Sequence, residues 1–241
     1  MIARKYWRSI FPCLFPFLII ASSSFAVERA NLSFYLSFED GIAPAIAGGQ
    51  PGTNTPIKFH LGSAKDIEIV AGLRGSGLRA KPGLYLQYLT RDSFSLKEGT
   101  IAFWVKPVGW SGLKEGHTFL YVRSDQVALH FNLVPGNVYY YVDNCAGQYY
   151  LINTAEDGSQ RDPFRDGEWT FLTGTFKPGE QRFYINGHFM NAMTTGVLEP
   201  VFSKKGVVEI PEGNQVIDEV MIFDRVLTDK EIKAIYEANA P

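Results

Sequence analysis

Short apolar runs recur along the chain and are separated by Gly, Pro, Asn and Asp. Residues 32–38 alternate, which places Leu32, Phe34, Leu36 and Phe38 on one face of a predicted strand. Further strands are predicted at 100–105, 119–122, 127–133, 138–142, 149–152, 169–176, 181–185, 188–191 and 216–223. Short strands at this spacing, joined by turn residues, are typical of an all-β sandwich or barrel.

Two hairpins can be predicted from turn residues. Asn186-Gly187 is the strongest turn signal, because both residues tolerate positive φ, and it joins 181–185 to 188–191. A second hairpin is predicted around a turn at 143–147. These two turns fix the order of several neighbouring strands.

The predicted strand at 216–223 carries two adjacent carboxylates, Asp218 and Glu219, in its middle. Burying carboxylates costs free energy unless a partner compensates for their charge. Either a basic partner, such as Arg79 or Arg225, or a cation is therefore implied. Alternation assigns the apolar residues to two faces, Val216, Val220 and Ile222 with Asp218, and Ile217, Met221 and Phe223 with Glu219.

One helix is predicted, at the C-terminal end of the chain. Thr228 and Glu231 form a capping box, with Thr228 as the N-cap. Ile232, Ile235 and Tyr236 then make an apolar stripe about one turn apart. We expect this stripe to pack on the sandwich.

Composition and charge narrow the class of protein. The chain has 241 residues, 46% hydrophobic and 20% charged, and a formal net charge of −2. These values exclude a disordered chain, a collagen-like chain and a basic nucleic-acid binder.

Residues 1–26 have the three parts of a signal peptide. A basic start with Arg4, Lys5 and Arg8 precedes an apolar stretch of 11 residues, 10–20, and cleavage is predicted after Ala26. The apolar stretch is shorter than the roughly 20 residues that span a bilayer. We therefore expect export to the periplasm or the extracellular space, with a retained anchor as the alternative.

The mature chain, 27–241, is expected to form a single domain. It has 20 basic and 25 acidic residues, net −5, because the leader contains three basic residues and no acidic ones. It keeps one cysteine, Cys145, so an internal disulfide is excluded. Cys145 is interpreted as a small buried residue, with an intermolecular disulfide as the alternative.

A series of motifs over residues 38–236 resembles the laminin G-like (LamG) jelly rolls of the concanavalin A-like lectin/glucanase superfamily. The resemblance implies two antiparallel sheets packed face to face, with a concave side. The motifs are Phe38-Glu39-Asp40-Gly41, Gly75 to Ala80, Gly99 to Pro107, Glu168-Trp169-Thr170-Phe171, Arg182 to Gly187, Ile217-Asp218-Glu219-Val220 and Leu227 to Ile232.

The resemblance also implies a structural calcium ion. Many members of the superfamily hold one with an early acidic motif and a late Asp. Carried over to this chain, the ligands are Glu39, Asp40 and Asp218. Carboxylates and main-chain carbonyls suit calcium, which takes six to eight oxygen ligands.

Candidate catalytic residues are few. No Glu is followed by Asp two residues later, so the carboxylate pair of sandwich-fold glycosidases is missing as a local motif. The four histidines are isolated in sequence. A glycoside hydrolase, or a polysaccharide lyase using His130 with Tyr139 or Tyr141, remains the alternative to a non-catalytic protein.

A tyrosine-rich region is the best candidate for ligand binding. Tyrosine combines an apolar ring with a hydroxyl group, which suits the face and edge of a sugar. We predict a binding module for carbohydrate or a surface glycoconjugate; the alternatives are rings packed in the core and a protein-binding module with a flat apolar patch. The candidate contacts are Tyr139, Tyr141, Tyr149 and Trp110 for stacking, and Asp143, Asn144 and Gln148 for polar recognition.

Overall fold

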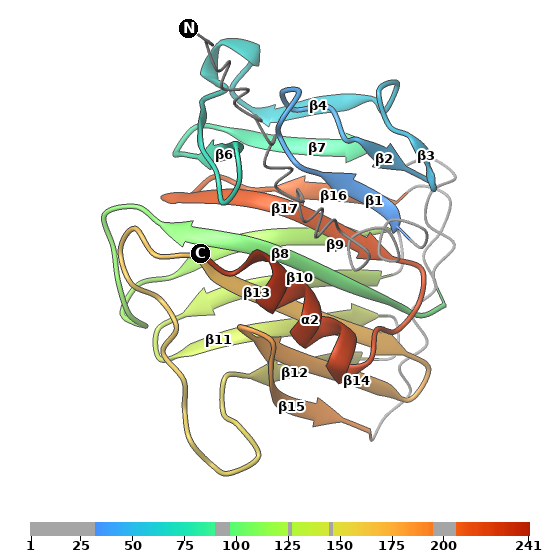
Figure 1. The fold of residues 1–241 in the computed structure, drawn as a ribbon, viewed down its shortest axis with the longest axis vertical. Helices are drawn as coiled ribbons and strands as arrows, with labels where there is room; N and C mark the ends of the chain where they lie inside the picture. The colour runs from blue at the N-terminus through green and yellow to red at the C-terminus, as the bar shows by residue number, and fades with distance from the viewer. Residues whose placement is uncertain (1–31, 90–96, 125–126, 145–146, 195–205) are drawn as a thin grey trace, which may run out of the picture.

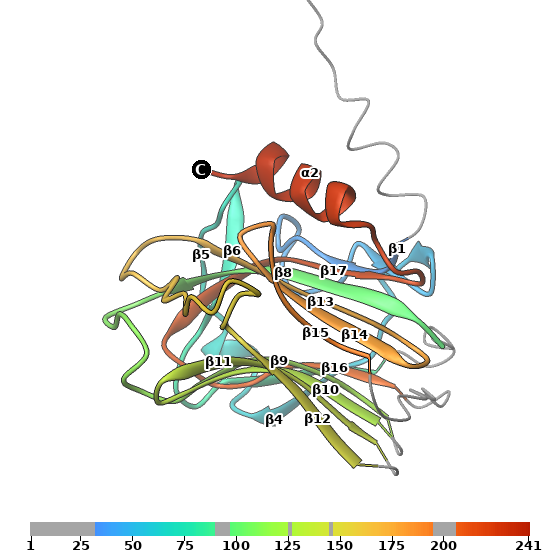
Figure 2. The ribbon, with the colours of Figure 1, turned by 90° about the horizontal axis from the view of Figure 1, so that it is seen from below.

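A computed structural model describes residues 32–89, 97–124, 127–144, 147–194 and 206–241, without the side chains of Asn144 and Tyr149. The predicted signal peptide and Cys145 lie outside the described residues. Two antiparallel sheets pack face to face, and helix α2 (Asp229–Asn239) lies on the outer side of one of them (Figure 1 and Figure 2). The predicted all-β jelly-roll sandwich is confirmed.

The larger sheet has ten strands. From one edge to the other it contains β15 (His188–Met193), β14 (Glu180–Ile185), β13 (Thr170–Lys177), β8 (Gly99–Pro107), β17 (Gln215–Phe223), β1 (Leu32–Leu36), β2 (Ile46–Ala47) and β3 (Gln50–Pro51), with β6 (Ser76–Ala80) paired to β17 and β5 (Ile69–Ala71) paired to β6.

The smaller sheet has seven strands. Its order is β12 (Gly147–Ile152), β11 (Asn137–Asn144), β10 (Val127–Val134), β9 (His117–Arg123), β16 (Val207–Ile210), β7 (Tyr85–Leu89) and β4 (Ile57–Leu61). A short 3-10 helix, η1 (Ala64–Asp66), follows β4. Within the described part of the chain, no helix is long and apolar enough to cross a membrane.

Two apolar clusters hold these layers together. The main core lies between the sheets, where Phe131 of β10 meets Phe103 of β8 edge to face, with ring centroids 5.0 Å apart. The second cluster lies between the ten-stranded sheet and α2, where Tyr236 stacks on Trp104 at 5.6 Å. One sheet is therefore apolar on both faces, and the other is apolar on its inner face.

The predicted division of β17 into two faces is wrong beyond Asp218. Glu219 adopts a positive φ of 51°, and the pairing of β17 with β8 shifts register between Asp218 and Met221. This bulge puts Val220 in the main core with Ile217, and puts Met221 in the cluster under α2. Alternation fails here because one extra residue exchanges the faces of everything that follows.

A similar shift occurs in β1. The pairing of β1 with β17 shifts register between Leu32 and Phe34. Leu32 therefore packs with Tyr35 in the cluster under α2, whereas Phe34 and Leu36 enter the main core. The prediction that Leu32 shares a face with Phe34 is wrong for the same reason.

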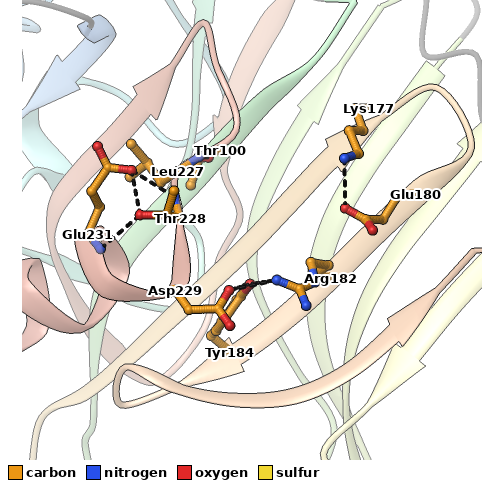
Figure 3. A network of polar contacts seen from close by, with 9 residues as sticks. All are labelled: Thr100, Lys177, Glu180, Arg182, Tyr184, Leu227, Thr228, Asp229 and Glu231. Atoms are coloured by element: carbon orange, nitrogen blue, oxygen red, sulfur yellow. Dashed lines mark hydrogen bonds and ion pairs between the residues drawn. The ribbon is translucent and has the colours of Figure 1, made fainter.

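The capping box of α2 forms as predicted (Figure 3). The Glu231 N–H donates to Thr228 Oγ1 at 3.3 Å, and the Glu231 carboxylate accepts from the Thr228 N–H at 2.8 Å. A hydrogen-bonded ion pair with Arg225, aided by the Thr228 donors, lowers the pKa of Glu231 to about 2. Asp229 ties the helix start to β14 by accepting from Arg182 at 2.6 Å and from Tyr184 at 2.8 Å.

Candidate functional site

The outer face of the seven-stranded sheet carries the candidate site. Alternation along β11 buries Val138, Tyr140 and Val142 in the main core, which turns Tyr139 and Tyr141 to the other side. None of the described elements lies over this outer face, whereas α2 covers the outer face of the larger sheet (Figure 2). Side chains that point outward from β10, β11 and β12 are therefore available to a ligand.

Strand register brings three rings together on this face. Tyr141 is the pairing partner of His130 on β10 and of Tyr150 on β12. The Tyr141 and Tyr150 rings are nearly parallel, at 8°, with centroids 6.3 Å apart. The His130 ring meets Tyr141 edge to face at 4.2 Å. The three rings form a continuous aromatic surface across three neighbouring strands.

This aromatic surface borders a hollow of about 320 Å³. Its volume falls within the usual range of small-molecule sites. Tyr150 leaves 53% of its surface exposed at the hollow. The residues that line the hollow are His130, Asn132, Val134, Tyr139, Tyr141 and Tyr150.

Two polar side chains in the hollow have unusual states. Burial lowers the pKa of His130 to about 4, so the imidazole is neutral at physiological pH. The amide nitrogen of Asn132 lies 3.0 Å from Nδ1 of His130, which leaves the proton on Nε2 in this placement of the amide. Asn132 Oδ1 is buried and has no hydrogen-bond partner among the described residues.

The structure brings four of the predicted site residues onto this face. Tyr139 and Tyr141 line the hollow, and Asp143 continues the same side of β11. Gln148 is the pairing partner of Asp143 across the hairpin and is exposed. Burial, Asp143 and the neighbouring Tyr150 together raise the pKa of Tyr141, so its hydroxyl stays protonated.

Two other predicted residues, Asn144 and Tyr149, are described only in their main chains. Asn144 pairs with Gly147 and with Val127, and Tyr149 pairs with Val142. Their side chains lie outside the described part of the molecule. Their roles in binding therefore stay predictions.

Trp110 is not on this face, and its predicted role as a stacking platform is wrong. Only 7% of its surface is exposed, and its ring stacks on His117 with centroids 3.8 Å apart. Its indole N–H donates to the Asn214 carbonyl at 2.6 Å, and Phe164 packs against it at 5.2 Å. The loop containing Trp110 folds inward because the ring buries more apolar area there than on the surface.

Sequence reasoning did not place four residues of the hollow in the ligand site, although it considered one of them, His130, as a lyase residue; the four are His130, Asn132, Val134 and Tyr150. Tyr150 pairs with Tyr141 because the described pairing of β11 with β12 continues to Asn144 and Gly147. Extending the two predicted strands as far as Asn144 and Gly147 would have found this register. Leu129, Phe131 and Leu133 of β10 are buried. His130 and Asn132 alternate with them and therefore point outward, a pattern that the sequence also shows.

Further along the same face lies a buried carboxylate, Glu209 of β16. It has no exposed surface. It accepts from Arg123 at 2.6 Å, from Gln87 at 2.5 Å and from Tyr85 at 3.0 Å. Arg123 extends over the Tyr121 ring, with the guanidinium carbon 5.9 Å from the centroid. Three donors from two other strands thus surround one carboxylate on the outer side of the sheet.

The acidic residues predicted to bind calcium lie on the other sheet. Asp218 Oδ2 accepts from the Leu73 N–H at 2.7 Å, and Oδ1 accepts from the Glu219 N–H at 2.8 Å. Glu39 Oε1 accepts from the Ser76 N–H at 3.1 Å. Both carboxylates therefore hold the turn between β5 and β6. Asp40 is exposed, and the described residues contain no group of three or more acidic, His or Cys side chains arranged for a metal.

Neither arginine proposed as a partner compensates Asp218. Arg225 pairs with Glu231 at 2.6 Å, and Arg79 donates to the Gln215 carbonyl at 3.4 Å. Burial raises the pKa of Asp218 to about 7, and the charges of Glu219 and Glu39 add to this effect. The expectation of an Arg225 or Arg79 partner is therefore wrong for Asp218, where main-chain amides take that place, whereas Glu219 accepts from the Tyr35 hydroxyl at 2.7 Å.

A family model described as the concanavalin A-like lectin/glucanases superfamily matches residues 84–233, more than half of the 241 residues. The chain belongs to this superfamily. The resemblance drawn from the motifs is thereby confirmed. The matched range covers β7 to β17, which include strands of both sheets, and the start of α2. A search of curated proteins with this superfamily member finds no significant match.

Solved structures with the same fold are binding domains of clostridial toxins. The binding domain of Paraclostridial Mosquitocidal Protein 1 has a TM-score of 0.66 and 19% identity, covering 87% of this chain and 52% of its own. A structure described as "Cell entry of botulinum neurotoxin type C is dependent upon interaction with two ganglioside molecules" has a TM-score of 0.68 and 15% identity, covering 90% and 53%. The binding domain of botulinum neurotoxin DC in complex with rat synaptotagmin II has a TM-score of 0.66 and 12% identity, covering 88% and 52%.

The TM-scores establish a shared fold for this chain and the toxin domains, and identities below 20% show nothing beyond the fold. The chain spans about half the length of each toxin domain it matches. One fold hosts many functions, so the function must be argued from the site.

Proposed function

We propose that this protein is a non-catalytic module that binds carbohydrate or a glycoconjugate at the hollow on the outer face of the seven-stranded sheet. The observation that carries the proposal is the row of Tyr150, Tyr141 and His130 beside that hollow. Ring faces pack against the C–H faces of a sugar, while phenol and amide groups bond its hydroxyls. The Asn132 side chain adds an amide to the lining of the hollow.

The solved structures with the same fold support a binding role. One of them concerns the interaction of botulinum neurotoxin type C with two ganglioside molecules. Another holds a protein partner, rat synaptotagmin II. A glycan ligand is favoured over a protein ligand for this chain because the exposed face offers rings and polar tips in a hollow. Protein interfaces more often present a broad apolar patch.

Removing either of two tyrosines that line the hollow should weaken glycan binding by about tenfold or more, the loss of roughly 1.4 kcal/mol or more of binding energy. The variants are Tyr141→Ala and Tyr150→Ala, tested against a panel containing cellulose, xylan, mannan, alginate, pectin, heparin and ganglioside oligosaccharides. Ile69→Ala, which removes a side chain that is 40% exposed on the other sheet, is the matched control. Unchanged affinity in both tyrosine variants would contradict the assignment of this hollow.

The pair formed by His130 and Tyr141 favours a polysaccharide lyase as the second candidate. A neutral imidazole beside a phenol can act as a base and an acid in β-elimination. The same incubations therefore need a product assay, by the ultraviolet absorbance of an unsaturated sugar. Chain cleavage that His130→Ala abolishes would replace the non-catalytic assignment with a lyase.

We also propose that the protein is exported to the periplasm or the extracellular space. The basic, apolar and small-residue segments of 1–26 support this proposal. Glycans at a cell surface or outside the cell would then be the accessible ligands. The mature product would begin at Val27.

We further propose a structural calcium ion at the turn between β5 and β6. Asp218 and Glu39 both bond this turn, and their mutual repulsion raises the pKa of Asp218 further. A Cβ built on Gly72 would lie 2.5 Å from Asp218 Oδ2 and 2.4 Å from the Ser76 carbonyl oxygen, so these two oxygens converge. When bound, the ion would neutralise the two carboxylates, with Glu39, Asp218 and main-chain carbonyls as its ligands.

Calcium should therefore raise the thermal stability of the protein. At a calcium concentration about 100 times Kd, linkage predicts about 2.7 kcal/mol of added stability relative to a chelator. Asp218→Asn should remove this difference, and Asp157→Asn, a change at an exposed loop carboxylate, should keep it. Equal melting temperatures in calcium and in chelator, measured on the unaltered chain, would refute the calcium proposal.

A further inference from the structure

The outward side chains of the seven-stranded sheet form one row that crosses every strand. The first half of the row is aromatic. Tyr150 pairs with Tyr141, Tyr141 with His130, and His130 with Tyr121 on β9. The Tyr121 and His130 rings lie 5.1 Å apart, so the aromatic surface continues beyond the hollow to a fourth strand.

The second half of the row is polar. Tyr121 pairs with Glu209, Glu209 with Gln87, and Gln87 with Lys58 on β4. Six strand spacings of about 4.8 Å make the whole row about 29 Å long. The row is therefore much longer than the hollow, and a single sugar would occupy only one end of it.

Charge is unevenly distributed along this row. In the polar half Glu209 is fully buried, whereas the Arg123 side chain that bonds it is 46% exposed. A guanidinium group has five N–H donors, and Glu209 takes one from Nη2 of Arg123. Lys58 is exposed at the β4 end. The charged groups that a ligand meets in this half are therefore cations, with Glu209 holding Arg123 in place from below.

We propose that the face binds a linear acidic glycan whose chain runs across the strands. Its sugar rings would stack on the tyrosines of β12, β11 and β9, and separate carboxylate or sulfate groups along the chain would bond Arg123 and Lys58. Planar guanidinium groups suit these anions because they donate two parallel hydrogen bonds. This inference rests on the proposed function and adds the ligand's charge, its length and its direction on the sheet.

Matched pairs of polysaccharides test the charge. Polygalacturonate and alginate are compared with their carboxyl-reduced forms, and heparin with its desulfated form, by titration calorimetry on the full mature chain. We expect the acidic form to bind at least tenfold more tightly, with affinity falling as salt rises. Comparing the effect of carboxyl reduction with the effect of desulfation shows whether the face recognises carboxylate or sulfate groups.

Variants that remove a basic side chain test where on the sheet the anionic groups of the ligand bind. Lys58→Ala and Arg123→Ala should each weaken binding of the acidic form and leave the reduced form unaffected. Lys233→Ala removes an exposed lysine on α2 and should change neither. Arg123→Ala also removes a partner of the buried Glu209, so its fold is checked by thermal melting. Lys58→Ala leaves the partners of Glu209 in place, so it tests the position of the anion site even if Arg123→Ala is unstable.

The length of the polysaccharide fragment tests whether the glycan chain runs across the strands of the sheet. With size-graded fragments of the best acidic polysaccharide, affinity should rise until the fragment spans the row, and Lys58→Ala should weaken only the longer fragments. Equal affinity for acidic and neutral forms, or for short and long fragments, would overturn this inference while glycan binding at the tyrosines stands. Absence of binding to every polysaccharide would overturn the proposed function as well.

Discussion

Trp110→Ala is expected to lower the free energy of unfolding by about 3–5 kcal/mol, the usual cost of removing a large aromatic side chain from a core. The ring is 93% buried, since 7% of its surface is exposed, and it packs between His117 and Phe164. The change also leaves the Asn214 carbonyl without the indole donor that lies at 2.6 Å. Glycan affinity of the molecules that remain folded should be unchanged, because Trp110 does not line the hollow.

Denaturant unfolding gives the stability, and calorimetry below the transition gives the affinity. Trp110→Phe is the control, because it keeps a stacking ring and loses the indole hydrogen bond and part of the ring volume, a smaller cost of about 1–3 kcal/mol. If Trp110→Ala reduced affinity as strongly as Tyr141→Ala and left stability intact, Trp110 would belong to the ligand site after all.

Local patterns were sufficient to predict the longer strands and the cap of α2, but not the shorter strands β2–β6 and β16. Turn chemistry at Asn186-Gly187, where both residues have positive φ, produces the hairpin of β14 and β15. The capping box at Thr228 forms because it depends on residues three apart in sequence. Such features need no knowledge of which strands become neighbours.

Features that depend on distant strands could not be predicted in the same way. The bulge at Glu219 arises in the pairing of β17 with β8, and it exchanges two faces that alternation had assigned. Glu209 finds Gln87 and Arg123 across β7 and β9, more than 80 residues away in sequence. Burial of Trp110 likewise requires Phe164 from a distant loop. Tyr139 and Tyr141 of the hollow were found because alternation along a single strand, β11, turns both to the same side, whereas Tyr150 depends on the register of β12 and was missed.

The inner side of β11 holds the tyrosines of the hollow in place. Tyr140 lies between Tyr139 and Tyr141 in sequence and points into the core, where it stacks on Phe131 at 4.9 Å. Its ring rests directly on Gly174 of the opposite sheet. A Cβ built on Gly174 would lie 2.6 Å from two of the Tyr140 ring carbons. The glycine is therefore required by this close approach between the sheets.

Gly174→Ala should consequently destabilise the protein by about 1–3 kcal/mol or more, because the Tyr140 ring has no room to yield in a packed core. Displacing Tyr140 would also move β11, so affinity for the glycan should fall in parallel. Gly116→Ala is the matched control, since a Cβ there meets its nearest atom, the Leu133 carbonyl oxygen, at an ordinary 3.6 Å.

A double-mutant cycle with Tyr140→Leu separates this contact from a general effect on β13. Without the aromatic ring, Gly174→Ala should cost much less, giving a coupling energy of about 1 kcal/mol or more. Additive losses would show that Tyr140 does not depend on Gly174. In that case the outward tyrosines would owe their position to the pairing of β10, β11 and β12 alone, and Gly174→Ala would leave glycan affinity intact.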